Sequence, residues 1–136
     1  MAILSPRLEV IKNQKVQPTD GEWKILEFLL QNLDNTYEVF YQPYLNGDNP
    51  DIIIMRYGYG VIIIEVKDWF LKHYRIDEFT KWRLKKDDTL LVSPFSQVEK
   101  YKENLFHLHI EELFQYRIIK KNDWNFVNCM VYFHNA

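Results

Sequence analysis

The chain is poor in the residues that build disulfides, zinc knuckles and repeats. Its 136 residues include one cysteine, four glycines and five prolines. Because Cys129 has no second cysteine to pair with, an internal disulfide and a zinc knuckle are both excluded, and a reducing intracellular setting is favoured. We therefore expect a cytoplasmic protein. The low glycine and proline content, together with 16% aromatic residues, excludes a disordered or repetitive chain.

Long apolar runs and an excess of positive charge are also missing. Arg56 and two nearby glycines interrupt the most apolar stretch, so no segment reaches the roughly 18 residues that a membrane helix requires. Seventeen basic and nineteen acidic residues give a net charge of −2. This balance excludes a protein that coats nucleic acid by charge alone. We expect no membrane partner, and any nucleic-acid function must use a local site.

Hydrophobic patterning predicts an N-terminal arm over residues 1–18 and one mixed α/β domain over residues 19–136. The expected elements are a helix over 19–33, strands over 37–44, 51–56 and 60–67, a hairpin over 81–92, a helix over 93–114 and a strand over 126–133. The two helices are expected to begin at a Thr-x-x-Glu capping box and at a Ser-Pro pair. Because the chain ends three residues after the last strand, we expect the domain to be part of a longer protein.

The hairpin in the middle of the chain brings two carboxylates together. If Tyr57-Gly58-Tyr59 is a three-residue loop, Arg56 pairs with Gly60 and Asp51 lies directly opposite Glu65. A five-residue loop gives the same register, whereas a two- or four-residue loop places the carboxylates on opposite faces. Directly opposed side chains have β-carbons about 4.5–5.5 Å apart, and like charges there are destabilising. A bound cation or a shared proton would explain such a pair.

Lys67 lies two positions after Glu65, so on a strand the two side chains share one face. Carboxylate oxygens suit Mg²⁺ or Mn²⁺, which accept substrate phosphates, and a nearby lysine can steady the charge on a phosphate. Asp51, Glu65 and Lys67 therefore predict a metal-dependent site that cleaves phosphodiesters. The alternative is that these are solvated charges at strand ends, with Glu65 and Lys67 merely paired. Their position just outside a doubly buried hairpin favours the metal site.

Two further polar residues lie on the core-facing sides of the expected helices. Glu22 completes the capping box, but it also lies in line with Leu26 and Leu29, so it projects from the apolar stripe. Gln97 lies in line with Tyr101 on the inner face of the second helix. The alternatives, a simple capping residue and a core-edge amide bonded to backbone, remain open.

The ordered motifs resemble those of a known nuclease family. Pro50-Asp51, thirteen residues, and Glu65-Val66-Lys67 match the PD-(D/E)xK nuclease motif, and the wider set resembles the nuclease-related domain (NERD). The further matches are Gly21-Glu22, Asp68-Trp69, Trp82, Pro94-x-x-Gln97 and Val131-Tyr132-Phe133. They cover about residues 20–134. Ser93 and Phe70-Leu71 depart from the family pattern, which has asparagine and Ser-Gly at these places.

The resemblance implies a restriction-endonuclease-like α/β fold, a mixed sheet flanked by helices, around one metal-dependent site. The implied site residues are Glu22, Asp51, Glu65, Lys67 and Gln97. Asp51 and Glu65 would bind Mg²⁺ or Mn²⁺ with the backbone carbonyl of Val66, and Glu22 would bind a second metal or a metal-bound water. Lys67 would orient or activate the attacking water, and Gln97 would position these groups.

The resemblance also implies DNA as the substrate and a DNA helicase or another DNA-processing module as a downstream domain. The alternative function is a non-catalytic module that uses the same fold to bind DNA or a partner protein. Basic residues gather at 81–86, around Trp82, and at 117–121. They indicate either contacts with a DNA backbone or a solvated hairpin and helix end. The four histidines are interpreted as structural or exposed, because His107 and His109 cannot face one metal from a helix.

Overall fold

A computed structural model describes residues 1–44, 48–105 and 127–135 of the chain. Its elements, in chain order, are β1 (Ile3–Ser5), α1 (Leu8–Lys12), α2 (Asp20–Asn32), β2 (Tyr37–Tyr41), β3 (Ile52–Arg56), β4 (Gly60–Phe70), the 3₁₀ helix η1 (Leu71–His73), β5 (Tyr74–Ile76), β6 (Trp82–Leu84), β7 (Leu90–Leu91), α3 (Pro94–Leu105) and β8 (Val127–Asn135). This mixed α/β architecture confirms the predicted fold class and is consistent with a restriction-endonuclease-like fold. No helix in the described ranges is long and apolar enough to cross a membrane.

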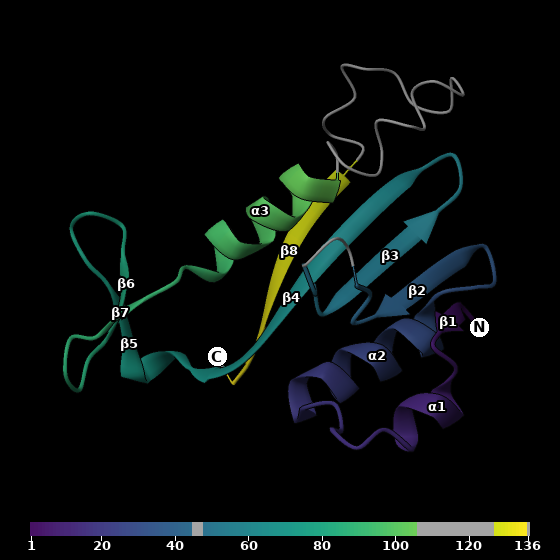
Figure 1. Ribbon diagram of the computed structural model, residues 1–136, viewed down its shortest axis with the longest axis horizontal. Coiled ribbons are helices and arrows are strands. Elements are labelled where there is room, and N and C mark those ends of the chain that lie inside the picture. The colour runs from purple at the N-terminus through teal and green to yellow at the C-terminus, as the bar shows by residue number, and fades with distance from the viewer. Residues whose placement is uncertain (45–47, 106–126, 136) are drawn as a thin grey trace.

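Five strands form the main sheet, in the order β1-β2-β3-β4-β8 (Figure 1). The outer pairs, β1–β2 and β4–β8, are parallel, whereas β3 pairs antiparallel with both neighbours. Ile52 and Ile54 pack with α1 and α2 on one face, and Ile53 and Ile63 pack with α3 on the other. The central strands are therefore covered on both sides, as their continuous apolar runs predict.

The hairpin between β3 and β4 has the predicted odd-length loop. Arg56 pairs with Gly60 and Ile52 pairs with Ile64, which confirms the register derived from the sequence. Gly58 has a φ of +80° in the middle of the turn, a conformation that glycine adopts without steric cost. Extending the same register by one residue brings Asp51 opposite Glu65, just beyond the end of β3.

Both long helices begin at the predicted residues. The Thr19 hydroxyl accepts the Glu22 backbone N–H at 3.2 Å, and the Thr19 backbone N–H donates to the Glu22 carboxylate at the same distance. The Ser93 hydroxyl accepts the Ser96 backbone N–H at 3.3 Å, directly before Pro94 opens α3. These bonds satisfy donors that a helix start would otherwise leave unpaired. The expected continuation of α3 to residue 114 lies outside the described residues, as do His107, His109 and the basic segment 117–121.

Residues 1–18, expected to be an arm, are part of the folded structure. β1 pairs in parallel with β2, and the Ile11 side chain of α1 is fully buried in the core on the α2 face. The sequence missed them because three strand residues and five helix residues are too few to show a hydrophobic period. The boundary between the arm and the domain stays a prediction.

The predicted strand boundaries are wrong by a few residues at several ends. β2 ends at Tyr41 rather than at residue 44, because Gln42 has a positive φ of 46° and Pro43 has no N–H to donate to a sheet. β4 continues to Phe70 and β8 to Asn135, three and two residues beyond their expected ends. These extensions form together, because the two strands pair with each other as far as Phe70 and Asn135.

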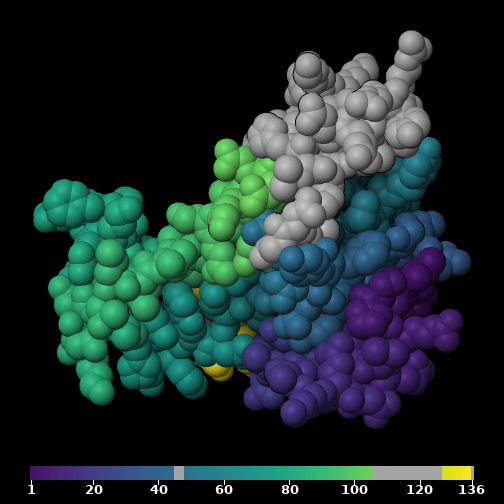
Figure 2. All heavy atoms as spheres, viewed as in Figure 1, coloured from purple at the N-terminus to yellow at the C-terminus, as the bar shows by residue number. Residues whose placement is uncertain are grey.

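A second sheet, β5-β6-β7, projects from the body of the molecule beyond the start of α3 (Figure 2). The predicted hairpin is confirmed, with Trp82 opposite Leu91, while β5 was not predicted. Trp82 is buried within this hairpin. Arg83 is held by Asp77 at 2.8 Å.

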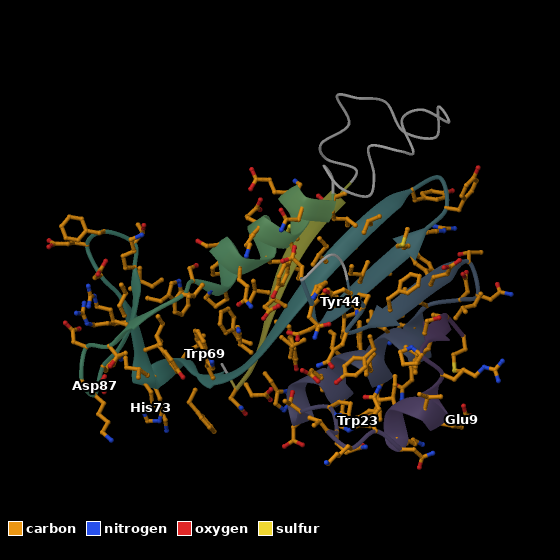
Figure 3. All side chains as sticks on the ribbon, viewed as in Figure 1. Glu9, Trp23, Tyr44, Trp69, His73 and Asp87 are labelled. Atoms are coloured by element: carbon orange, nitrogen blue, oxygen red, sulfur yellow. The ribbon has the colours of Figure 1, made fainter. Side chains whose placement is uncertain are left out.

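Aromatic packing fixes this small sheet to the main one. Trp69, at the junction of the two sheets in Figure 3, stacks on Tyr74 with ring centroids 4.5 Å apart. Trp82 in turn stacks on Phe133 of β8 at 5.8 Å. The small sheet is therefore held to the ends of β4 and β8, close to the predicted catalytic residues.

Candidate functional site

The two predicted carboxylates lie at the open end of the β3–β4 hairpin. Asp51 directly precedes β3, and its Oδ2 accepts the Val66 backbone N–H at 2.8 Å. Alternation along the two strands places Asp51 and Glu65 on the α3 face of the sheet, in line with Ile53 and Ile63. β3 begins at Ile52 and pairs with β4 only as far as Ile64. Past Ile64, the Val66 N–H of β4 therefore bonds to the Asp51 side chain instead of to the backbone of β3.

Burial gives this pair unusual electrostatics. Burial raises the pKa of Asp51 from 3.8 to about 6; the Val66 N–H opposes the rise, the charge of Glu65 adds to it and Lys67 lowers it. Glu65 is only 4% exposed. Its Oε2 is buried and has no hydrogen-bond donor among the described residues. Two ionised carboxylates cannot donate to each other, whereas a proton held by Asp51 or a bound cation would satisfy this oxygen.

Lys67 lies beside the pair, as the strand periodicity predicts. Its Nζ is 3.1 Å from Glu65 Oε1, and its side chain is 20% exposed. The same ammonium lies 5.3 Å from the centroid of the Trp69 ring, a favourable cation–π distance. Lys67 is thus held between a carboxylate and an aromatic face, with part of its surface open to solvent.

Glu22 approaches this region from α2, on the other face of the sheet. It is 7% exposed, and it accepts a hydrogen bond from the Tyr41 hydroxyl at 2.6 Å in addition to its capping bond. Burial raises the pKa of Glu22, and the charges of Asp51 and Asp68 raise it further, while the bonds from Tyr41 and Thr19 lower it. Both interpretations of Glu22 therefore hold together: it caps the helix and it faces the core. Tyr41 was not predicted as a partner of Glu22, because the pattern of residues 37–44 indicated only a strand.

Asp68 fixes the first turn of α2 against β4. Its Oδ1 accepts the Gly21 backbone N–H at 2.9 Å, and a carboxylate at a helix start is favoured by the helix dipole. A β-carbon on Gly21 would lie 2.9 Å from that oxygen and 3.0 Å from Val66 Cγ1. Glycine is therefore needed before Glu22, because the helix comes so close to the strand.

Gln97 is hydrogen-bonded to Tyr101, whose hydroxyl senses the charge of the carboxylates. Gln97 Nε2 donates to the Tyr101 hydroxyl oxygen at 2.9 Å. Burial raises the pKa of Tyr101, and the charges of Glu65, Asp51 and Asp48 raise it further, while the Gln97 bond lowers it. The Tyr101 hydroxyl, which holds the predicted amide, thus lies within the electrostatic field of the carboxylate pair.

A groove of about 580 Å³ opens beside Tyr101, and its lining residues are Asp48, Asn49, Val92, Ser96, Gln97, Lys100 and Tyr101. Asp48 is 9% exposed and accepts a hydrogen bond from Asn104 Nδ2 at 2.6 Å. The sequence analysis did not single out Asp48, because nothing local indicates that Asn104 of α3 bonds to it.

A family model described as the nuclease-related domain matches residues 17–134 of the chain. The chain belongs to this family. No curated protein and no solved structure matches it. Membership in the nuclease-related domain family carries a nuclease-related function and interaction with nucleic acid. The matched range contains every candidate residue, from Glu22 to Gln97.

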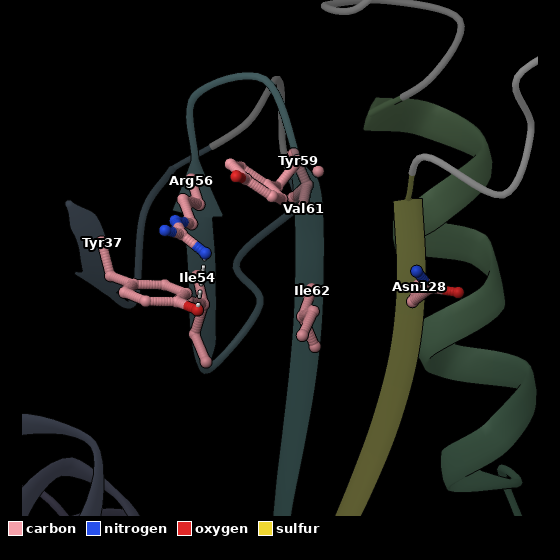
Figure 4. Close-up of a pocket in the computed structure, with 8 residues that line it drawn as sticks. Tyr37, Ile54, Arg56, Tyr59, Val61, Ile62 and Asn128 are labelled. Atoms are coloured by element: carbon pink, nitrogen blue, oxygen red, sulfur yellow. Dashed lines mark hydrogen bonds between the residues drawn. The ribbon is translucent and has the colours of Figure 1, made fainter. Parts of the chain in front are cut away.

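A second cavity of this nuclease-related domain, about 200 Å³, lies at the turn end of the β3–β4 hairpin (Figure 4). The Arg56 guanidinium carbon lies 4.0 Å from the centroid of the Tyr59 ring and 4.9 Å from that of Tyr37. No carboxylate lines the cavity among the described residues. It therefore offers no cation site, and the carboxylate pair remains the candidate centre of the nuclease-related domain.

The donor set at that centre is small. Within residues 1–44, 48–105 and 127–135, no three His, Cys, Asp or Glu side chains are grouped to hold a metal ion. Asp51 and Glu65 therefore need backbone or water oxygens to complete a coordination sphere. The backbone of Val66 is suitably placed, because its N–H points to Asp51 and the N–H and C=O of a strand residue face the same neighbour.

Proposed function

We propose that this chain is a metal-dependent phosphodiesterase that cleaves DNA. The supporting observation is the buried Glu65 Oε2, which accepts no hydrogen bond from the described residues, beside Asp51. Leaving such an acceptor unsatisfied costs about 1–3 kcal/mol, and a divalent cation between two carboxylates would remove this cost. Asp51, Glu65 and the Val66 carbonyl would hold Mg²⁺ or Mn²⁺. Once bound, the ion would polarise the phosphate and stabilise charge on the leaving oxygen.

The other residues act on water and on the phosphate. Lys67 presents a partly exposed ammonium beside Glu65, where it can donate to the attacking water or to a phosphate oxygen. The raised pKa of Glu22 makes it a better proton acceptor than an exposed glutamate. We assign to it a metal-bound water or a second metal. Gln97 positions the Tyr101 side chain, which lines the groove beside the site, through their hydrogen bond.

We further propose that the domain acts as the nuclease module of a larger cytoplasmic DNA-processing protein, such as a helicase. The motif resemblance described above supports this assignment. The low overall charge also suits a module that receives its DNA from a neighbouring domain, because the chain alone carries a net charge of −2.

Cleavage assays with matched variants test the proposal. Linear and circular DNA is incubated with the protein and Mg²⁺ or Mn²⁺, with EDTA as the metal-free control. Lys67→Ala should abolish cleavage but keep the fold and metal binding, whereas Glu65→Ala should lose both metal binding and cleavage. Lys24→Ala and Glu27→Ala remove the same charges from exposed positions on α2, and they should cleave as the wild type does.

A further variant separates the two roles of Glu22. Glu22→Gln should keep α2 intact, because glutamine also completes a capping box, yet it should slow cleavage. Wild-type protein that binds DNA without EDTA-sensitive cleavage would replace the catalytic proposal with the binding module. Cleavage that persists undiminished in Lys67→Ala and Glu65→Ala would come from a contaminant and would overturn the assigned site.

A further inference from the structure

Arg56, at the turn end of the β3–β4 hairpin, carries a positive charge that no described carboxylate balances. It forms no ion pair with an acidic side chain of the described residues. Its guanidinium makes one hydrogen bond to them, from Nη1 to the Tyr37 hydroxyl oxygen at 3.4 Å, which is long for such a bond. Since a guanidinium has five N–H donors, most of its hydrogen-bonding capacity is open to a ligand.

Two tyrosine rings hold this guanidinium at the wall of the cavity shown in Figure 4. The guanidinium carbon lies 4.0 Å from the centroid of the Tyr59 ring and 4.9 Å from that of Tyr37. Tyr37 is also the register partner of Arg56, so the two side chains share one face of the sheet. Stacking on a ring uses the flat face of a guanidinium and leaves the N–H groups at its edge available. The rings therefore fix the position of a group that can bind an oxyanion.

The cavity beside Arg56 has the size and the donors that a phosphate group requires. Its volume of about 200 Å³ is several times the roughly 30 Å³ that one water molecule occupies in the liquid. The Tyr37 hydroxyl lines it too, and while its oxygen accepts from Arg56 it keeps a hydrogen to donate. An arginine fork binds phosphate through two parallel N–H bonds. Phosphate has further oxygens for the hydroxyl, and it is the anion that nucleic acid, the ligand of this family, carries.

The cavity is separate from the candidate catalytic centre. Strand alternation places Arg56 on the α2 face of the sheet, in line with Ile52 and Ile54, whereas Asp51 and Glu65 lie on the α3 face. Arg56 is also five residues from Asp51, which at roughly 3.3 Å per residue is about 17 Å along the strand. A phosphate at Arg56 is therefore not the one that the carboxylate pair would cleave.

We propose that the cavity between Tyr37, Arg56 and Tyr59 binds the phosphate group of a nucleotide, with the Arg56 guanidinium donating two N–H bonds to its oxygens. A free nucleotide and a nucleic-acid strand present the same group, and the probes below distinguish them. The inference is independent of the proposed function, because binding at this cavity requires neither a metal ion nor cleavage.

Isothermal titration calorimetry in EDTA measures this binding while the carboxylate pair holds no metal. The probes are inorganic phosphate, thymidine monophosphate and oligothymidine, and thymidine is the control ligand without phosphate. Arg56→Ala should weaken binding of the phosphate probes roughly 10- to 150-fold. Arg56→Lys should restore only part of the affinity, because an ammonium lacks the planar fork. Tyr59→Leu, at a position 72% exposed, should keep the fold and weaken binding by releasing the guanidinium. Arg7→Ala, at an exposed position outside the cavity lining, is the matched control and should bind as the wild type does.

The outcomes identify the ligand and separate this inference from the proposed function. Tighter binding of thymidine monophosphate than of oligothymidine would support a free nucleotide as the ligand, and the reverse would support a strand. No measurable binding of any phosphate probe, or thymidine bound as tightly as its monophosphate, would overturn the inference. Equal affinities of Arg56→Ala and Arg7→Ala would also overturn it, as would a loss in Lys67→Ala instead, which would assign the phosphate to the candidate centre. Phosphate binding that depends on Arg56, without cleavage in Mg²⁺ or Mn²⁺, would support this inference while refuting the proposed function. EDTA-sensitive cleavage without phosphate binding at Arg56 would do the reverse.

Discussion

Asp51→Asn should stabilise the metal-free protein at neutral pH. The carbonyl oxygen of the asparagine can still accept the Val66 N–H, which Asp51 Oδ2 accepts at 2.8 Å. Its amide N–H₂ can also donate to the buried Glu65 Oε2, which has no donor among the described residues. The substitution therefore removes a buried charge and keeps the backbone contact.

The size and pH range of this gain follow from the raised pKa of Asp51. Below pH 3.8, Asp51 keeps its proton in both the folded and the unfolded state, so it imposes no penalty on folding. As the pH rises toward about 6, the unfolded state releases the proton first, and the free energy of unfolding falls. Above about 6 the penalty is complete. Each unit of pKa shift corresponds to about 1.4 kcal/mol. The free energy of unfolding therefore falls by up to about 3 kcal/mol as the pH rises from 3.8 to about 6.

Urea unfolding in EDTA, followed by tryptophan fluorescence at a series of pH values across this window, measures the effect. The gain of Asp51→Asn over the wild type should grow as the pH rises through the window and then level off. Asp87→Asn is the control: hydrogen bonds from Thr89 lower the pKa of Asp87, so removing its charge should give no such gain. A constant gain at every pH, or a loss of stability at neutral pH, would show that the site does not disfavour the Asp51 carboxylate.

Three further outcomes are expected. Mn²⁺ or Mg²⁺ should raise the melting temperature of the wild type, by mass action on the folded state, but not that of Asp51→Asn; equal shifts would mean that the ion binds elsewhere. Gly21→Ala should lower the free energy of unfolding by about 1–3 kcal/mol, because its β-carbon would lie 2.9 Å from Asp68 Oδ1; an unchanged urea midpoint would contradict this close contact. Trp82→Ala should cost about 3–5 kcal/mol by emptying the aromatic cluster, and a cost below about 1 kcal/mol in the same assay would argue against its burial.

Local sequence signals are sufficient to determine several features of this protein. The capping box at Thr19 acts over four positions, so no distant contact is needed to identify the start of α2. The parity of the 57–59 loop likewise determines which side chains of β3 and β4 share a face. Once the loop is known to have an odd length, as the pairing of Arg56 with Gly60 shows, Asp51, Glu65 and Lys67 are assigned to one face of the hairpin.

Tertiary structure alone decided how these residues are surrounded. The Asp68 carboxylate accepts the Gly21 N–H across 47 positions of sequence. The Tyr41 hydroxyl, in β2, donates to the Glu22 carboxylate of α2. Neither contact has a local pattern, because each forms only when α2 packs on the sheet. The folding of residues 1–18 and of β5 was equally hidden, since such short elements form by pairing with strands that come later in the chain. Burial, which raises the pKa of Asp51, is a property of the packed molecule and of no residue in isolation.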